Sequence, residues 1–239
     1  TINRTLESVR WCDEVIIIDD FSTDETVDIA KKAGAKIYAR QLHDDFAEQR
    51  NFGLSKANGE WALFVDSDEV VTPQLAQEIK QVVEIPNPKS QIPINGYYIK
   101  RNDFMFGKWL RYGETGNVSL LRLAKKDAGK WTRPVHEVWD IKGQTDTLKS
   151  PLLHSSHPNV AQFLSEINYY STINANYLFK THTPSLAWKI VVYPTAKFIH
   201  NFIFRFGFLD GMQGLILAIL MSFHSFLTRG KLWLLHHKR

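Results

Sequence analysis

The residues of this chain that are best suited to chemistry are two groups of acids. Asp19-Asp20 follows the run Val15–Ile18, and Asp66-Ser67-Asp68-Glu69 follows Trp61–Val65. Carboxylates that converge on one edge of a fold repel one another, so they need either solvent or a cation. A hard divalent ion such as Mg²⁺ or Mn²⁺ suits such a site because it takes carboxylate and phosphate oxygens as ligands. Both groups can also be interpreted as ordinary turn and helix-capping residues, which fits Asp19-Asp20 better than the second group.

An alternation of strands and helices is expected to position these acids. Val15–Ile18 and Trp61–Val65 are continuous apolar runs, typical of strands buried on both faces, and Lys36–Ala39 is expected to form a short strand between them. Ser22 and Glu25 have the spacing of a capping box and predict a helix that ends near Gly34. Further helices are predicted over Ala47–Ala57 and from Pro73 to about Val83. This order implies right-handed crossovers and a mostly parallel sheet, whose ligands bind beyond the carboxyl ends of the strands.

The second half of the chain follows a different pattern. Strands are expected at Tyr97–Lys100, Val118–Leu123 and Asp146–Leu153, separated by irregular segments, so the sheet should be mixed. From Asn159 onward the apolar spacing is helical, with two more apolar helices after Pro184 and Gly207. The sequence therefore predicts an α/β domain over residues 1–158 with a mixed, mostly parallel central sheet, followed by a helical extension over residues 159–239.

Composition excludes several classes of protein. An apolar fraction of 44% over 239 residues is ample for a buried core, so disorder is not expected. The single cysteine, Cys12, excludes an internal disulfide framework and a cysteine-rich zinc site, and is most simply a small packed side chain in a reducing cytoplasm. The start of the chain shows no signal-peptide pattern.

The C-terminal part of the chain is basic and apolar. From Trp188 to Arg239 there are seven lysines and arginines and one acid, Asp210, so this tail carries about +6 and the remainder about −2. Gly211–Thr228 contains no charged residue and is just long enough to be considered as a membrane span, although polar residues interrupt it. We expect a helix that lies on the bilayer surface or one that covers the core or a dimer partner. The basic residues sit among large apolar ones, which argues against nucleic-acid binding.

Three segments together resemble a known family. The segments are Val15-Ile16-Ile17-Ile18-Asp19-Asp20-Phe21-Ser22-Thr23-Asp24-Glu25-Thr26, Gln49-Arg50-Asn51-Phe52-Gly53 and Trp61-Ala62-Leu63-Phe64-Val65-Asp66-Ser67-Asp68-Glu69. In this order and spacing they resemble family 2 glycosyltransferases with the GT-A fold. Later segments narrow the resemblance to the bacterial lipopolysaccharide core β-1,4-glucosyltransferase subgroup, over essentially the whole chain: Gly96-Tyr97-Tyr98, Arg133-Pro134-Val135-His136-Glu137, Pro151-Leu152-Leu153-His154 and Gly207-Phe208-Leu209-Asp210-Gly211.

The resemblance implies roles for individual residues. Asp20 matches an aspartate that contacts the nucleotide base, and Ser22 beside it is assigned to the same nucleotide-sugar site. Asp66 matches the first acid near the ribose and metal, and Asp68 the acid that binds the metal bridging the diphosphate. Arg50 matches a basic residue near the nucleotide, although it can also be a solvated helix arginine. By analogy His154 closes the metal site as a late imidazole ligand, or is simply hydrogen-bonded at a strand end.

The chemistry implied is transfer of a sugar with inversion at the anomeric carbon. A divalent cation, Mg²⁺ or Mn²⁺, held by Asp68 would stabilise the departing diphosphate as a Lewis acid. The acceptor hydroxyl must lose a proton as it attacks, and Glu137 is the preferred base, with His136 as its rival and a structural role for both as the alternative. The expected donor is a UDP-sugar, with glucose inherited from the resemblance, and the expected acceptor is a lipid-linked lipopolysaccharide or lipooligosaccharide core at the cytoplasmic face of the inner membrane.

The resemblance departs from the family pattern at the start. Members of the family begin with an interior strand that supplies further nucleotide contacts, whereas this sequence begins at Thr1 in what is expected to be the following helix. The first strand is therefore expected to be missing from this sequence, which we interpret as truncation.

Three alternatives remain open from the sequence. One is a glycosyltransferase of the same family that acts on another cell-envelope glycan. A second is a haloacid-dehalogenase-like phosphatase, because Ala62–Val70 fits an apolar strand followed by Asp-x-Asp-x-Val with Asp66 as nucleophile; two strands precede it, however, and no downstream Gly-Asp completes that metal site. The third is a sugar- or nucleotide-binding module without catalysis.

Overall fold

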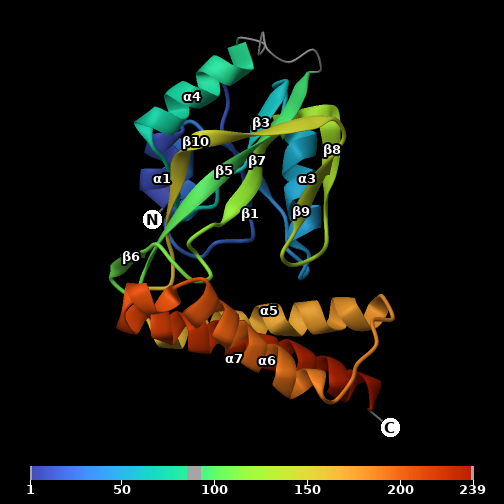
Figure 1. Cartoon of the computed structure of the whole chain (residues 1–239). Coiled ribbons are helices and arrows are strands. Elements are labelled where there is room, and N and C mark those ends of the chain that lie inside the picture. Colours follow the sequence, from blue (N-terminus) through green and yellow to red (C-terminus); the bar gives the residue numbers. More distant parts are fainter. Residues whose placement is uncertain (1, 85–92, 238–239) are drawn as a thin grey trace. The chain divides into compact units, whose positions relative to one another are not determined.

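The computed structural model describes residues 2–84 and 93–237 of the chain (Figure 1). The chain divides into two compact units. Residues Thr1–Arg101 and Ser119–His154 form the first, which we call the sheet unit, and Asn102–Val118 and Ser155–Arg239 form the second, the helical unit. The helical unit therefore contains a stretch from the middle of the sequence besides the C-terminal helices. Lys238 and Arg239, two of the basic residues of the tail, lie outside the described residues.

The elements of the sheet unit follow the expected alternation at its start. Its strands are β1 (Ile16–Asp19), β2 (Lys36–Ala39), β3 (Trp61–Leu63), β4 (Glu69–Val71), β5 (Ile94–Met105), β7 (Ser119–Lys125), β8 (Gly129–Thr132), β9 (Val138–Ile141) and β10 (Gln144–Ser155). Its helices are α1 (Ile2–Ser8), α2 (Thr26–Lys32), α3 (Phe46–Lys56) and α4 (Pro73–Glu84). The strands and helices expected from the sequence are present, while β4, β8 and β9 were not expected. β1 and β3 are half-buried rather than fully buried.

The sheet is mixed, but the expectation that it is mostly parallel is wrong. β1 and β2 pair in parallel in a sheet of their own, and β3 joins a six-stranded sheet in the order β3-β7-β5-β10-β4, with β6 on β5. Within the described pairings, β3–β7, β5–β7 and β4–β10 are all antiparallel. The crossover pattern predicted one continuous parallel sheet from β1, β2 and β3, whereas β3 pairs with a strand about sixty residues later, which short-range patterns do not encode.

Two apolar clusters position the site. In the first cluster, Leu75 and Ile79 of α4 pack with Ile99, Leu123 and Leu152 of the sheet, and all five side chains are almost completely buried. On the other, Ala47 and Leu54 of α3 pack with Trp131 and Trp139 of β8 and β9. Figure 1 shows α3 beside β8 and β9. α3 is therefore anchored by its apolar face, which leaves its polar residues free to face the site.

The expected capping box is wrong. α2 begins at Thr26, and Glu25, at the N-cap position, makes no side-chain capping hydrogen bond. Ser22 instead donates its hydroxyl to the Asp19 carboxylate at 2.6 Å, and its backbone N–H lies 3.2 Å from the same carboxylate. Ser22 bonds to Asp19 instead of capping α2, because serine side chains bond readily to nearby acceptors in turns. The predicted end of the helix is confirmed, with Gly34 in the left-handed region at φ 80°.

The helical unit is built on α5 (Val160–Lys180), α6 (Lys189–Ile199) and α7 (Met212–His236), with the short strand β6 (Lys108–Leu110). A turn of π-helix (His200–Phe204) and a turn of 3₁₀-helix (Gly207–Asp210) connect α6 to α7. α7 packs against both α5 and α6, and Leu217 and Leu220 meet Phe163 and Ile167 in a third core (Figure 1). The helices expected after Asn159, Pro184 and Gly207 are confirmed. By length and composition alone, α7 is able to cross a membrane.

Glu14 holds together the starts of the first three strands of the sheet unit. Its carboxylate accepts from Lys36 Nζ at 2.7 Å and from the Asn58 backbone N–H at 2.6 Å, which joins the residues that precede β1, begin β2 and precede β3. The hydrogen bond from Lys36, followed by that from Asn58, lowers the pKa of Glu14 to about 2 from 4.5.

We expect Glu14→Gln to lower the free energy of unfolding by about 1–2 kcal/mol at neutral pH, because a charged acceptor of several hydrogen bonds is lost. Since the pKa is depressed in the folded state, this stabilisation is fully present above pH 4.5 and is lost as pH falls towards 2. Urea unfolding across that range should show the native and Glu14→Gln proteins converging in acid. Glu60→Gln, at an exposed carboxylate, is the control, and an equal effect of both changes would contradict the role of Glu14.

Candidate active site

The acidic segment forms a tight turn between β3 and β4. The Asp66 N–H donates to Glu69 Oε2 at 2.9 Å, and the Glu69 N–H donates to the Asp66 carbonyl at 2.9 Å, so the turn is closed from both ends. The Thr5 hydroxyl of α1 lies 2.9 Å from the Ser67 carbonyl and 2.7 Å from the Glu69 carbonyl. α1 thus holds the turn from outside, and the backbone geometry of the acidic segment is set by residues distant in sequence.

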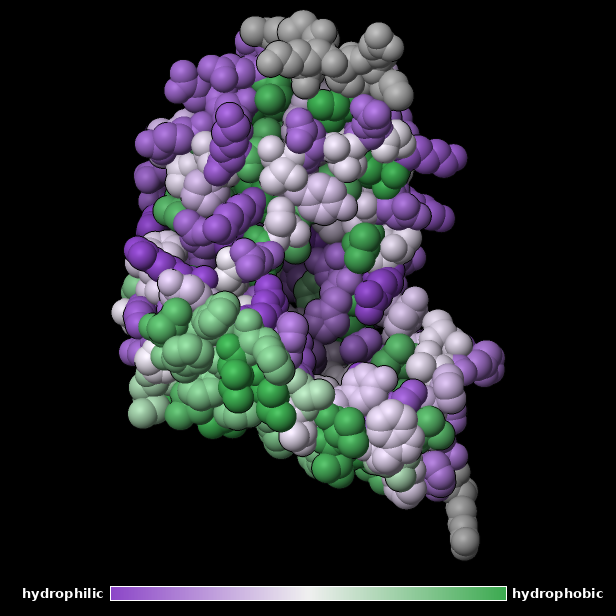
Figure 2. Space-filling model, viewed as in Figure 1, coloured by the Kyte–Doolittle hydropathy of each residue, from purple (hydrophilic) through white to green (hydrophobic). Residues whose placement is uncertain are grey.

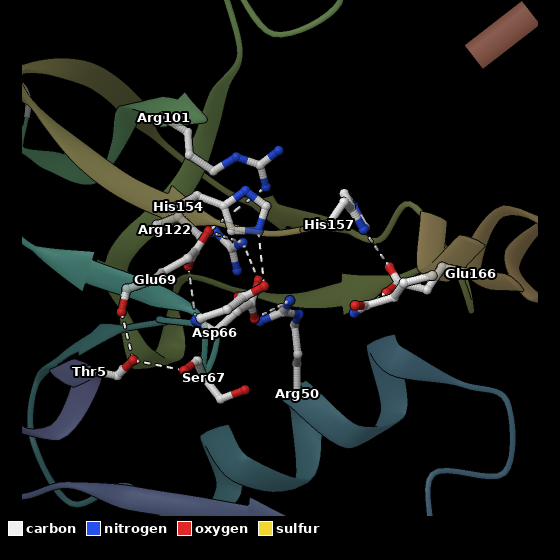
Figure 3. Close-up of polar contacts among 12 residues, drawn as sticks. Thr5, Arg50, Asp66, Ser67, Glu69, Arg101, Arg122, His154, His157 and Glu166 are labelled. Atoms are coloured by element: carbon white, nitrogen blue, oxygen red, sulfur yellow. Dashed lines mark hydrogen bonds and ion pairs between the residues drawn. The ribbon is translucent and has the colours of Figure 1, made fainter. Parts of the chain in front are cut away.

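Two arginines bind the first acid of this turn. Asp66 Oδ1 lies 2.9 Å from Arg50 of α3, and Asp66 Oδ2 lies 2.6 Å from Arg122 of β7. Arg122 also lies 3.2 Å from Glu69 Oε1, and the Glu69 side chain is completely buried. Arg101, also labelled in Figure 3, places its Nη1 atom 3.9 Å from Glu69 Oε1. These side chains come from α3, β4, β5 and β7 and from the turn before β4, so the cluster connects four elements of the sheet unit.

Arginines and burial together set the pKa values of Asp66, whose side chain is partly exposed, and of Glu69, which is completely buried. Burial by itself raises the pKa of Asp66, but the positive charges of Arg122 and then Arg50 outweigh it and hold that pKa well below its usual range. Burial raises the pKa of Glu69, and although Arg122 opposes the rise, the negative charge of Asp66 adds to it and the net pKa is raised. Burial lowers the pKa of Arg122, but Asp66 and Glu69 raise it further, so its guanidinium stays charged.

Arg50 brings Asp66 and Glu137 together. Its Nη2 contacts Asp66, and its Nε donates to Glu137 Oε1 at 2.8 Å. The guanidinium lies over the Trp131 ring, 4.9 Å from the ring centroid. Asn51, the next residue, exchanges hydrogen bonds of 2.9 and 2.8 Å with the Trp131 backbone, which fixes α3 against β8. Arg50 is therefore a half-buried, doubly paired side chain rather than a solvated helix arginine.

Asp68 and His154 form a second pair on the turn. His154 Nε2 lies 3.2 Å from Asp68 Oδ2, and their side chains are 11% and 35% exposed. The register of β10 against β4 explains the contact, because His154 is the partner of Glu69 and so lies beside the acidic turn. The two residues predicted as metal ligands therefore lie next to each other.

The donors of this pair fit a divalent cation that also binds phosphate. Neighbouring ligands of an octahedral ion with bonds of about 2.1 Å lie roughly 3 Å apart, close to the separation of the two side chains. Among the described residues no group of three or more His, Cys, Asp or Glu side chains has the arrangement of a metal site. An ion here would therefore take the rest of its ligands from diphosphate and water, as Mg²⁺ commonly does.

The structure changes the argument that led to a metal. Mutual repulsion of the acids was expected to require a divalent cation, but Arg50, Arg101 and Arg122 already pair with Asp66, Glu69 and Glu137. Both oxygens of Asp66 are engaged by arginines, so its geometry favours a positioning role over the predicted metal coordination. The Asp68 carboxylate is about as exposed as that of Asp66 but contacts His154 rather than an arginine in the described ion pairs, so it suits a metal and a diphosphate better.

The remaining predicted site residues lie apart from the arginine cluster or at its edge. Asp20 is exposed and accepts from the Leu42 N–H at 3.0 Å, and Ser22 is bonded to Asp19; within the described contacts neither is linked to Arg50 or Asp66. His136 is exposed and has φ 52°, a conformation that is uncommon outside glycine, while Glu137 beside it points to Arg50. Of the two predicted bases, the structure brings Glu137 to the cluster.

Sequence reasoning missed Arg122, Thr5 and the role of Glu69. Arg122 is 5% exposed and interrupts the buried residues of β7, where Leu121, Leu123 and Ala124 are also buried. A charged residue inside a buried strand is almost always paired, which is the signal that could have identified it. Thr5 carried no such signal because its role depends only on where α1 lies.

The family model described as Glycosyl transferase family 2 matches residues 1–133, more than half of the chain. The chain belongs to glycosyl transferase family 2. It is thus a glycosyltransferase, and its α/β fold with a mixed central sheet followed by C-terminal helices is of the GT-A type. The phosphatase alternative has no support, because the family is different and because the Asp66 carboxylate, its required nucleophile, is held by two arginines.

Individual relatives are distant. An uncharacterized glycosyltransferase of Rickettsia conorii is 27% identical over 97% of this chain and 84% of its own length. The lipopolysaccharide core biosynthesis glycosyltransferase LpsC of Rhizobium meliloti is 25% identical over 98% of this chain and 88% of its own length. Among solved structures, S. aureus TarS 1–349 in complex with UDP aligns with a TM-score of 0.46 and 14% identity, over 100% of this chain and 88% of that one.

The enzyme should depend on Arg122 for stability. We expect Arg122→Met to lower the free energy of unfolding by about 3–5 kcal/mol, because Asp66 and Glu69 lose a buried positive partner. Adding Glu69→Gln should recover part of the loss by removing one of the uncompensated acids. Urea denaturation of the single and double variants measures both effects.

Lys125→Met is the matched control, because Lys125 lies on the same strand and pairs with Glu60 at the surface. Its cost should stay below about 1 kcal/mol. Equal costs for Arg122→Met and Lys125→Met would show that the buried network does not hold the site together.

Proposed function

We propose that this glycosyltransferase transfers a sugar, with glucose as the first candidate, from a UDP-sugar to a lipopolysaccharide or lipooligosaccharide core acceptor, with inversion at the anomeric carbon. The observation that carries the catalytic part of the proposal is the contact of Asp68 with His154 of β10, on a turn whose other acids, Asp66 and Glu69, pair with arginines. The acceptor class is supported by the similarity to LpsC over nearly the whole of both chains.

Asp68 and His154 would hold a divalent cation, which supplies Lewis-acid stabilisation of the negative charge that develops on the leaving diphosphate. The chain itself does the rest of the positioning. Arg122 and Arg50 fix Asp66, and the Asp66–Glu69 turn in consequence holds Asp68 in place immediately before β4. Asp20, exposed at the end of β1, is assigned to the nucleotide base, in a region separate from the arginine cluster.

Glu137 is assigned as the base that takes the proton from the acceptor hydroxyl. Its carboxylate is 16% exposed, and Arg50 holds it in one orientation through Oε1 at 2.7–2.8 Å. Fixing the carboxylate in advance reduces the entropy lost on reaching the transition state. Because Arg50 binds both Asp66 and Glu137, it connects the turn that carries Asp68 to the proposed base.

We expect Asp68→Asn and His154→Gln each to lower kcat by about 10²–10³-fold, because stabilisation of the leaving group is lost. The measurement is UDP release from a panel of UDP-sugars with Mg²⁺ or Mn²⁺ and truncated lipopolysaccharide acceptors. Excess chelator should abolish activity of the native enzyme, and Glu60→Gln should leave it unchanged.

Full activity in chelator, or in Asp68→Asn, would contradict the metal-dependent mechanism. UDP binding without sugar transfer to any acceptor would favour a binding module. Transfer to a different cell-envelope glycan, with the same dependence on Asp68, would retain the mechanism and replace the acceptor.

We expect Glu137→Gln to lower kcat by about 10²–10⁴-fold with little change in the KM for the UDP-sugar, because general-base catalysis is lost while donor binding is kept. His136→Gln, the adjacent change, should retain most of the activity. The reverse ranking, measured from initial rates with saturating donor, would assign the base to His136 instead.

A further inference from the structure

The segment that joins α6 to α7 buries polar side chains and exposes large apolar ones. Two of its polar residues, Asn201 and Asp210, are only 2% and 3% exposed, whereas Phe204 and Met212, the first residue of α7, are 69% and 65% exposed. Further apolar side chains of this segment that are at least 46% exposed are Ile203, Phe206, Phe208 and Leu209. A connection at the surface of a water-soluble domain normally has the opposite arrangement.

Hydrogen bonds hold the polar groups inward. The Asn201 side-chain amide donates to Glu114, and the Asp210 carboxylate accepts the backbone N–H groups of Arg111 and Tyr112 at 3.0 and 2.9 Å. Phe206 has φ 56°, a region that costs free energy for a bulky residue, yet its side chain remains exposed. The apolar side chains are thus presented outward by a fixed structure, and burial within the helical unit is not what holds them.

The neighbouring helices extend this apolar surface. On α7 the exposed side chains Ile219, Phe223, Phe226 and Leu234 recur at spacings of three to eight residues, which places them on one side of the helix. On α6 the most exposed residue is Val191, at 68%. Figure 2 shows hydrophobic side chains gathered over these helices and the segment between them. We call this surface, from Trp188 to Leu234, the apolar face.

The net charge of α6, the connecting segment and α7 is positive, although Lys197 of α6 is paired with Glu114. The one acid between Trp188 and Arg239, Asp210, is buried and bonded to backbone N–H groups, so it adds no exposed negative charge. Lys189 lies over the rings of Trp188 and Tyr193, 5.8 and 5.9 Å from their centroids, and Arg205 lies between the exposed phenylalanines. Apolar side chains bordered by aromatic rings and cations are typical of helices that bind anionic lipid headgroups.

We propose that the apolar face binds the surface of an anionic lipid bilayer, with α6 and α7 lying in the plane of the interface. A protein partner fits less well, because protein interfaces carry about one hydrogen bond per 100–200 Å² and this face presents mostly aliphatic and aromatic groups. A membrane-spanning α7 also fits less well, because its other side buries the polar residues His224 and Thr228 against the helical unit. This proposal does not depend on the reaction catalysed.

The test is flotation of the whole chain with vesicles of phosphatidylcholine that contain or lack phosphatidylglycerol. The native protein should float with the anionic vesicles. The double change Phe204→Ser with Phe208→Ser should lower its partition coefficient about tenfold or more, because two apolar anchors are removed. The control is Leu164→Ser with Tyr169→Ser, which removes two exposed apolar side chains of α5 outside the apolar face and should not alter flotation. Circular dichroism verifies that every variant is folded.

A second pair of changes tests the charge. Lys189→Gln with Arg205→Gln should weaken binding to the anionic vesicles about tenfold and leave binding to the vesicles without phosphatidylglycerol unchanged. The proposal is overturned if the native chain does not float with anionic vesicles, or if the double phenylalanine variant floats equally well. It is also overturned if the native chain is a dimer that the phenylalanine changes dissociate, without binding to vesicles, since the apolar face would then join two copies.

Discussion

The placement of one carboxylate between two guanidinium groups is the interaction on which the site depends. Asp66 binds Arg50 through one oxygen and Arg122 through the other, and these arginines come from α3 and β7. Removing Arg122 takes a positive partner from both Asp66 and the completely buried Glu69, which costs several kcal/mol. The turn that carries Asp68 is fixed as a consequence, and Arg50 extends the same network to Glu137.

This arrangement separates two tasks that the sequence places in adjacent residues. Both oxygens of Asp66 are bonded to arginines, whereas the Asp68 carboxylate, two residues later, lies beside His154, and both side chains are partly exposed. Electrostatic catalysis requires groups that are already oriented before charge develops, and a rigid turn held by buried ion pairs meets that requirement. The completely buried Glu69 closes the turn and shares Arg122, so even the non-catalytic acid contributes to the orientation.

The helical unit differs from the sheet unit in how its exposed apolar side chains are distributed. In the sheet unit, large exposed apolar side chains such as Phe21 and Val138 occur singly, as on most soluble proteins. Between α6 and α7 they follow one another while the polar groups are bonded inward, so hydrogen bonding and not the hydrophobic effect within the unit orients this segment. The exposed apolar side chains are then available to a phase less polar than water.

Local patterns determined much of this protein without any tertiary information. Apolar runs located β1 and β3, the spacing of apolar residues located α5 and α7, and the residues after the strands identified the acidic turn, because each of these signals acts over a few neighbouring residues. The family segments pointed correctly to a glycosyltransferase for the same reason, since their residues lie close together in sequence.

Only the tertiary structure decided how those acids are used. The partner of Asp66 on β7 is 56 residues away and that of Glu137 on α3 is 87 residues away, so their charge balance depends on strand pairing that no local pattern reveals. Local patterns also did not reveal that Ser22 bonds to Asp19 at the end of β1. Nor did they reveal that β3 pairs antiparallel with the distant strand β7. The sequence by itself determined which side chains are available for chemistry, and the long-range contacts determined which are neutralised and which remain accessible, because Coulomb energy and burial depend on distances in space.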